Sequence, residues 1–236
     1  MDTSLGAALG LGFVLGLRHA LDADHIAAVS ALVSQHRSVT RSCLLGTFWG
    51  AGHTVALLGA AVAVIAFRLT ISPAVERGLE LAVALLLILL GGHVLLKALG
   101  GWNLHAHEHS HDGYVHRHLH LHGTAGARGL SDGAHGHLHL IRLGGRPFLV
   151  GLLHGMAGSA ALMLLVLSTI PSPVGGFLYV LVFGVGSTAG MLVLSGLIGI
   201  PFAMSAQRSR VVQAVIQGLA GAASLLLGVL LAANTA

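Results

Sequence analysis

The most constraining feature of the sequence is a series of apolar windows, each long enough to cross a bilayer. A hydrocarbon core of about 30 Å takes about 20 residues of helix. Unpaired backbone groups are not tolerated in lipid, and the windows are too long and too uniformly apolar for barrel strands. The sequence therefore predicts an all-α integral membrane protein with six transmembrane helices. The windows are residues 5–34, 42–67, 78–99, 148–169, 175–202 and 211–233.

The composition excludes several other classes. Only 8% of the 236 residues are charged, whereas a soluble domain carries about a quarter. The pI near 10.2 could suggest nucleic acid, but the 12 basic residues stand singly between apolar runs. The single Cys43 excludes an intramolecular disulfide and a multi-cysteine metal site. No basic region precedes the first apolar run, so we expect it to be a retained span rather than a signal peptide.

Lysine and arginine residues orient the predicted bundle, because cytoplasmic loops retain basic residues. Nine lie on one side and two on the other, and the short loops alone give four against two. We therefore expect both termini outside the cell and the long central loop in the cytoplasm. The nine are Arg37, Arg41, Lys97, Arg117, Arg128, Arg142, Arg146, Arg208 and Arg210, and the two are Arg68 and Arg77.

Two segments of the first half recur in the second, at offsets of 135 and 134 residues. Gly16-Leu17-Arg18-His19 aligns with Gly151-Leu152-Leu153-His154, and Gly50-Ala51-Gly52-His53-Thr54 aligns with Gly184-Val185-Gly186-Ser187-Thr188. Two matches at nearly one offset predict a three-helix unit used twice. An odd number of crossings inverts the second copy, an arrangement that places a binding site at the repeat interface near the midplane. We therefore expect membrane repeats at 1–100 and 148–236, separated by a loop at 101–147.

Histidine is concentrated in that central loop. Residues 100–147 hold eleven of the seventeen histidines, many in alternating runs such as His105 to His111 and His116 to His122. Alternation places the imidazoles on one side of an extended chain, and such a tract cannot build a core, so we expect it to be mobile. Exposed imidazoles of pKa about 6.5 are mostly neutral at pH 7 and bind metal loosely. The loop is interpreted as a metal buffer or sensor, with a solvated low-complexity linker as the alternative.

The first span contains the stretch Arg18-His19-Ala20-Leu21-Asp22-Ala23-Asp24-His25-Ile26, with five ionisable groups. An aspartate at the centre of a span costs about 2.5 to 3.5 kcal/mol, so two are not expected without a use. On one continuous helix, His19, Asp22 and His25 share a face within an arc of about 120°. Two imidazoles and a carboxylate suit a borderline divalent transition metal. Asp24 falls on roughly the opposite side, and we expect it to find a partner on another helix.

A complete ligand shell needs donors from other helices. His53 in the second span and His154, the repeat counterpart of His19, are the candidates, although each could instead be a hydrogen-bonded interhelical histidine. Thr54, Thr188 and Ser187, the counterpart of His53, could fix ring orientation by hydrogen bonds. An intramembrane polar network that only ties helices together is the alternative interpretation for the whole set. His93 has no acidic neighbour and is expected to be structural.

These residues carry a resemblance to a known family. Arg18 to Ile26 resembles the first signature of the nickel/cobalt transporter (NiCoT) superfamily, and Phe48-Trp49-Gly50-Ala51-Gly52-His53-Thr54-Val55 looks like its second motif. The second half is similar to the short six-helix branch, which includes urease-associated nickel permeases and histidine-loop exporters. The resemblance implies passage of Ni(II) or Co(II), with His19, Asp22, Asp24, His25 and His53 as the metal residues. Unlike eight-helix members, this chain has no acidic residue in the second-half motif.

We therefore expect a secondary transporter that moves Ni(II) or Co(II), with the ion as cargo and no cofactor, in the direction of uptake. No Gly-x-x-x-x-Gly-Lys-Ser/Thr loop is present, so the chain is not expected to hydrolyse ATP or to be an enzyme. The alternatives are an exporter of the same fold, a membrane metalloenzyme, and a metal sensor or chaperone acting through the loop. Cytoplasmic nickel chaperones are possible partners.

Overall fold

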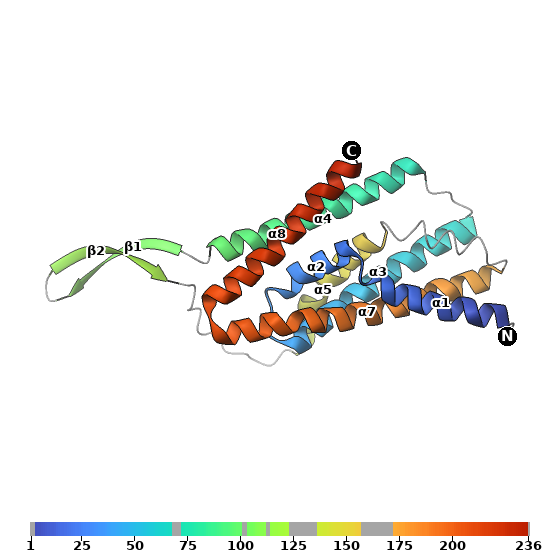
Figure 1. The fold of residues 1–236 in the computed structure, drawn as a ribbon, viewed down its shortest axis with the longest axis horizontal. Coiled ribbons are helices and arrows are strands. Elements are labelled where there is room, and N and C mark those ends of the chain that lie inside the picture. The colour runs from blue at the N-terminus through green and yellow to red at the C-terminus, as the bar shows by residue number, and fades with distance from the viewer. Residues whose placement is uncertain are drawn as a thin grey trace.

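A computed structural model describes residues 3–67, 72–100, 103–111, 114–122, 136–156 and 172–235. Within these ranges the part predicted to lie in the membrane is entirely helical, and a two-stranded hairpin projects away from it, far from both termini (Figure 1). The elements are α1 (Thr3–His19), α2 (Ala23–Val33), α3 (Val39–Phe67), α4 (Pro73–Gly100), β1 (Asn103–His111), β2 (Tyr114–His122), α5 (Gly136–Gly155), α7 (Pro173–Arg208) and α8 (Arg210–Thr235).

Four of the described helices are long and apolar enough to cross a membrane: α3, α4, α7 and α8. α1 and α2 pass the same test together as a bent pair, which gives up to five crossings. The predicted span at 148–169 begins within α5, and its part beyond residue 156 lies outside the described residues. The all-helical membrane class is therefore confirmed, while the sixth crossing stays a prediction.

The prediction of one continuous helix over 5–34 is wrong, because the chain bends by 55° between α1 and α2. α1 ends in a tightened turn, in which the amides of Leu21 and Asp22 donate to the carbonyls of Arg18 (2.8 Å) and His19 (3.0 Å). Asp22 then occupies the N-cap position of α2 with extended backbone, and its side chain makes no capping hydrogen bond but contacts His19 instead. Each half-helix also carries suitable charges, since Arg18 lies at the negative end of α1 and Asp24 at the positive end of α2. Because of the break, His19, Asp22 and His25 do not share the face of one continuous helix.

Glycines let the helices around this break approach closely. A Cβ on Gly16 of α1 would collide with the carbonyl oxygen of Phe183 in α7. A Cβ on Gly52 of α3 would collide in the same way with the carbonyl oxygen of Phe148 in α5. Small residues at such crossings are typical of membrane helices, where tight packing replaces the hydrophobic effect as the source of association. The α1, α3, α5 and α7 backbones are thus held near enough for their side chains to meet in the interior.

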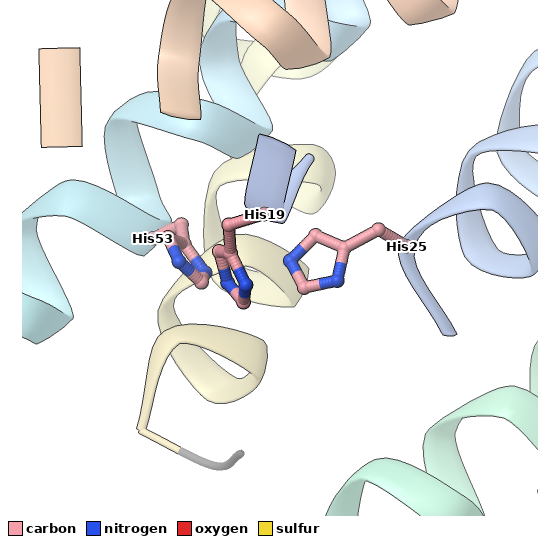
Figure 2. Close-up of side chains that lie close together, drawn as sticks. All are labelled: His19, His25 and His53. Atoms are coloured by element: carbon pink, nitrogen blue, oxygen red, sulfur yellow. The ribbon is translucent and has the colours of Figure 1, made fainter. Parts of the chain in front are cut away.

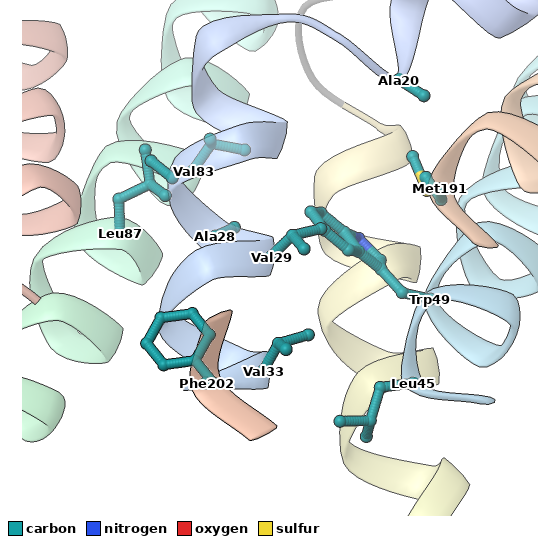
Figure 3. Packing of buried hydrophobic residues seen from close by; sticks show 11 residues of the cluster. Ala20, Ala28, Val29, Val33, Leu45, Trp49, Val83, Leu87, Met191 and Phe202 are labelled. Carbon is teal, nitrogen blue, oxygen red and sulfur yellow. The ribbon is translucent and has the colours of Figure 1, made fainter. Parts of the chain in front are cut away.

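α4 and α8 form a second layer, and α2 lies between it and the other helices (Figures 1 and 3). The two helices of this layer are joined by glycine contacts and by the buried Ser224 hydroxyl, which donates to the Leu87 carbonyl at 3.0 Å. On α2, Val29 and Val33 belong to a buried cluster that also includes Trp49 of α3 and Leu87 of α4. Packing on both sides therefore fixes α2, and with it the position of the residues at its N-terminus.

The turn after α2 is fastened to α4. The Lys97 ammonium donates to the Gln35 side-chain oxygen at 2.9 Å. The nearby His36 is half-buried, and burial, followed by the positive charges of Arg41 and Lys97, lowers its pKa below the ordinary value. The C-terminal end of α2, opposite the break, is therefore held against α4.

The central loop contains regular structure that qualifies the all-α prediction. β1 and β2 pair antiparallel, in a register that places His105 opposite His120, His107 opposite His118, and His109 opposite His116. The expected extended histidine tracts are thus described as strands. In addition, α5 begins at Gly136, within the segment assigned to the loop, so a helix already forms before the predicted second membrane repeat begins.

Candidate metal site

Four helices bring their histidines to one buried point. His19 is the last residue of α1 and His25 lies in the first turn of α2, while His53 lies along α3 and His154 near the end of α5. The side chains of His25, His53 and His154 are at most 1% exposed. The bend between α1 and α2 makes this possible, since it directs two neighbouring half-helix ends at the same interior point.

The first group consists of His19, His25 and His53, each of which offers a ring nitrogen within 4.8 Å of the others. The His19 ring centroid lies 4.5 Å from that of His25 and 5.1 Å from that of His53. Figure 2 shows the three rings converging, with one nitrogen of His25 directed toward the other two rings. The Nε2 atoms of His19 and His25 and both nitrogens of His53 are buried without a hydrogen-bond partner. Such orphaned polar atoms are costly unless something binds them.

Two carboxylates lie behind this group. An oxygen of Asp22 is 2.7 Å from Nδ1 of His19, and an oxygen of Asp24 is 3.0 Å from Nδ1 of His25. Asp24 also accepts a hydrogen bond from the His25 amide at 2.9 Å. Each carboxylate therefore occupies Nδ1 and leaves Nε2 facing the centre of the group. Metal-binding histidines are commonly held in this way, with a carboxylate on the second nitrogen that fixes the ring orientation.

The second group consists of Asp24, His25 and His154, whose donor atoms also lie within 4.8 Å of one another. The second oxygen of Asp24 is 2.9 Å from Nε2 of His154. The His154 ring centroid lies 4.3 Å from that of His25, and Nδ1 of His154 is buried without a partner. His25 and its hydrogen-bonded Asp24 therefore connect both groups.

Of the six residues predicted to bind metal, five lie in these two groups: His19, Asp24, His25, His53 and His154. The sixth, Asp22, lies in neither group, and its side chain is 54% exposed. Asp24 contacts α5 through His154, where sequence reasoning assigned it an unspecified partner on another helix. His93 is exposed on α4, away from both groups.

The hydroxyl residues expected to orient the rings lie elsewhere in the hydrogen-bond network. The Thr54 hydroxyl is 2.9 Å from the Gly184 carbonyl oxygen and 3.0 Å from the Thr188 hydroxyl, so the two threonines join α3 to α7. The Ser187 hydroxyl is buried without a partner. Helix association, rather than ring orientation, is thus the role of the threonines.

Sequence reasoning missed two aromatic neighbours of the histidines. Trp49 stacks on His25, with ring centroids 5.5 Å apart and planes at 16°, and meets His154 edge-on at 5.5 Å. Phe183 lies 5.5 Å from His19. The signal was present in the internal repeat, because residues 49 and 183 are separated by the same 134 positions as Thr54 and Thr188.

Comparison with known proteins identifies the family of the chain. The NicO family model, described as high-affinity nickel-transport protein, matches residues 5–226. The chain is therefore a membrane metal transporter of the NicO family, within the nickel/cobalt transporter superfamily. The urease accessory protein UreH of Bacillus sp. (strain TB-90) is 38% identical over 219 residues, which cover 89% of this chain and 83% of that relative. No solved structure matches the chain. Nickel is thus transported substrate rather than cofactor, and the family is one of transporters rather than enzymes.

Proposed function

We propose that this protein is a secondary transporter that takes up Ni(II), and also accepts Co(II), through the group formed by His19, His25 and His53. The observation that carries the proposal is the convergence of buried ring nitrogens, on all three histidines, that have no hydrogen-bond partner. Imidazole nitrogens suit nickel, cobalt, zinc and copper, whereas magnesium and calcium prefer oxygen ligands. The donor set therefore selects against the abundant alkaline-earth ions.

The charge of the site supports the binding of a dication. Three neutral imidazoles contribute no charge, but the carboxylates of Asp22 and Asp24 lie directly behind two of them. Their negative charges offset part of the ion's double charge and strengthen the rings as donors. A dehydrated dication in a low-dielectric interior requires such compensation.

We further propose that the membrane part consists of two inverted three-helix repeats, with the site at their interface. Support comes from glycine contacts that recur between the halves at the offsets of the sequence repeat. The Thr54–Thr188 pair, 134 residues apart, joins equivalent positions. Alternating access in such folds proceeds by rocking one repeat against the other around a fixed site. The contact of Gly16 with the Phe183 carbonyl matches that of Gly151 with the Trp49 carbonyl. The contact of Gly52 with the Phe148 carbonyl matches that of Gly186 with the Phe13 carbonyl.

The proposed direction is uptake, with both termini outside and the histidine hairpin in the cytoplasm. An inside-negative potential supplies about 2.3 kcal/mol per charge per 100 mV, hence about 4.6 kcal/mol for a dication, which drives entry without another coupled ion. The excess of basic residues on the hairpin side supports the orientation. A high-affinity system, as the matching family is described, suits capture of a scarce ion. Delivery of the ion to a cytoplasmic nickel chaperone would follow.

Export by the same fold is the second candidate, and the hairpin favours it. Its register places three pairs of histidines opposite one another, which would collect metal on the cytoplasmic side. Export against the potential would require proton antiport.

Proteoliposomes separate the two directions. The purified chain is reconstituted, an inside-negative potential is imposed, and uptake of labelled nickel is measured with His25→Ala and the exposed-histidine control His93→Ala. Uptake that follows the potential without a proton gradient, and that His25→Ala abolishes while His93→Ala preserves, supports the proposal. Flux that requires an opposing proton gradient indicates export, and flux indifferent to His25→Ala refutes the site.

A further inference from the structure

The two metal-binding groups differ in chemistry although they share His25. The first offers three neutral imidazoles, and the second offers two imidazoles and the Asp24 carboxylate. His25 stands between them, with its ring centroid 4.5 Å from that of His19 and 4.3 Å from that of His154. Its Nε2 faces the first group without a partner, whereas its Nδ1 is held by Asp24 on the side of the second.

The internal repeat relates the two groups to the two faces of the membrane. His19 and His154 occupy equivalent positions at an offset of 135 residues. In an inverted repeat, equivalent positions lie on opposite sides of the membrane midplane. The inverted repeat proposed above would therefore set the first group toward one membrane face and the second toward the other, with His25 between them. The aromatic neighbours follow the same relation, because Phe183 contacts His19 and its counterpart Trp49 contacts His154.

We propose that the transported ion passes through two successive stations that share His25, moving from His19, His25 and His53 to Asp24, His25 and His154. This inference rests on the proposed transport function. In the transfer, the bonds from the ion to His19, to His53 and to Nε2 of His25 break, and bonds to Asp24, to Nε2 of His154 and to Nδ1 of His25 form, with no change in oxidation state. The hydrogen bonds from Nε2 of His154 and Nδ1 of His25 to Asp24 open. Each neutral ring keeps its single proton on the other nitrogen, Nδ1 in His154 and Nε2 in His25.

The competing interpretation gives His154 only a positioning role, in which it orients Asp24 and, through it, His25. Both interpretations contain the Asp24–His154 hydrogen bond, and they differ in what remains when the first group is broken. A second station still binds metal without His53, whereas a positioning residue cannot bind the ion on its own.

Cobalt(II) is the probe, because its visible absorption reports the number and type of its ligands. The purified chain is titrated with Co(II) as wild type, His53→Ala, His154→Ala and His25→Ala, with His93→Ala as the control. Signal from the hairpin histidines is measured in His25→Ala, where both groups are broken, and subtracted. Gln variants at positions 53 and 154 repeat the measurement with side chains of similar size, in case alanine disturbs folding. Nickel flux into proteoliposomes is measured for every variant.

The proposal predicts that His53→Ala and His154→Ala each still bind one cobalt ion in the cluster, with spectra that differ from each other, while the flux of both falls at least about tenfold. His93→Ala matches the wild type in both assays. Complete loss of cluster binding in His53→Ala and in its Gln variant, or wild-type flux in His154→Ala, overturns the two-station proposal. Failure of the transport function is distinct, since it would appear as absent flux in the wild type even where cobalt binds.

Discussion

Replacing Asp22 distinguishes a metal ligand from a residue that positions a ligand. Its carboxylate lies 2.7 Å from Nδ1 of His19, and its side chain is 54% exposed. Loss of a carboxylate behind a metal-binding histidine typically weakens metal affinity by about 10- to 100-fold. Because Asp22 belongs to neither group of candidate ligands and contacts the site through His19, we expect the lower end for Asp22→Ala, about tenfold or about 1.4 kcal/mol. Asp22→Asn keeps an oxygen acceptor for the ring and is expected to lose less.

Calorimetric titration with nickel and proteoliposome flux, each compared with His25→Ala, measure this effect. His25→Ala removes a donor common to both groups and is expected to abolish binding by the cluster. The graded order Asp22→Asn, Asp22→Ala, His25→Ala is the signature of a positioning carboxylate. If Asp22→Asn were as damaging as His25→Ala, Asp22 would be a direct ligand. If Asp22→Ala had no effect, the hydrogen bond to His19 would be irrelevant.

Three further predictions concern packing, pH and the hairpin. Gly52→Val forces a side chain against the Phe148 carbonyl and is expected to lower the free energy of unfolding by about 1 to 3 kcal/mol. A thermal melt should show this as a lower midpoint, whereas the control Gly59→Val on the same helix meets open space and should leave the midpoint unchanged. The lowered pKa of His36 means that the unfolded chain binds its proton more readily. Stability should therefore fall as pH drops through 6.5, and His36→Asn should reduce that fall in a thermal melt. Serine at all hairpin histidines should leave most nickel flux intact, while major loss would indicate a sensor or an obligatory loading site.

The all-helical membrane class and the clustering of the candidate metal residues could be predicted from sequence because both leave strong local signals. A span requires a long apolar run, and ionised side chains within it require a use. The geometry at Asp22 could not be predicted in the same way. It depends on a helix break, and the stretch from His19 to His25 contains neither the proline nor the glycine that commonly marks one. The break is stabilised by the tertiary packing of α2, which hydropathy does not record.

The roles of the individual site residues were likewise only partly predictable from sequence. Sequence spacing identified five of the residues that meet, but it could not tell which imidazole nitrogen is free and which is held. That distinction depends on the distances from Asp22 to His19 and from Asp24 to His25 and His154. Trp49 lies within the second motif, yet its stacking on His25 depends on the packing of α3 against α2.

Locating nickel by its anomalous scattering in crystals of the loaded protein tests the central claim most directly. The account predicts a peak within bonding distance of ring nitrogens of His19, His25 and His53, with Asp22 behind the His19 ring rather than on the ion. A nickel peak found only on the hairpin, or bonded to the exposed Asp22 outside the histidine cluster, would contradict it.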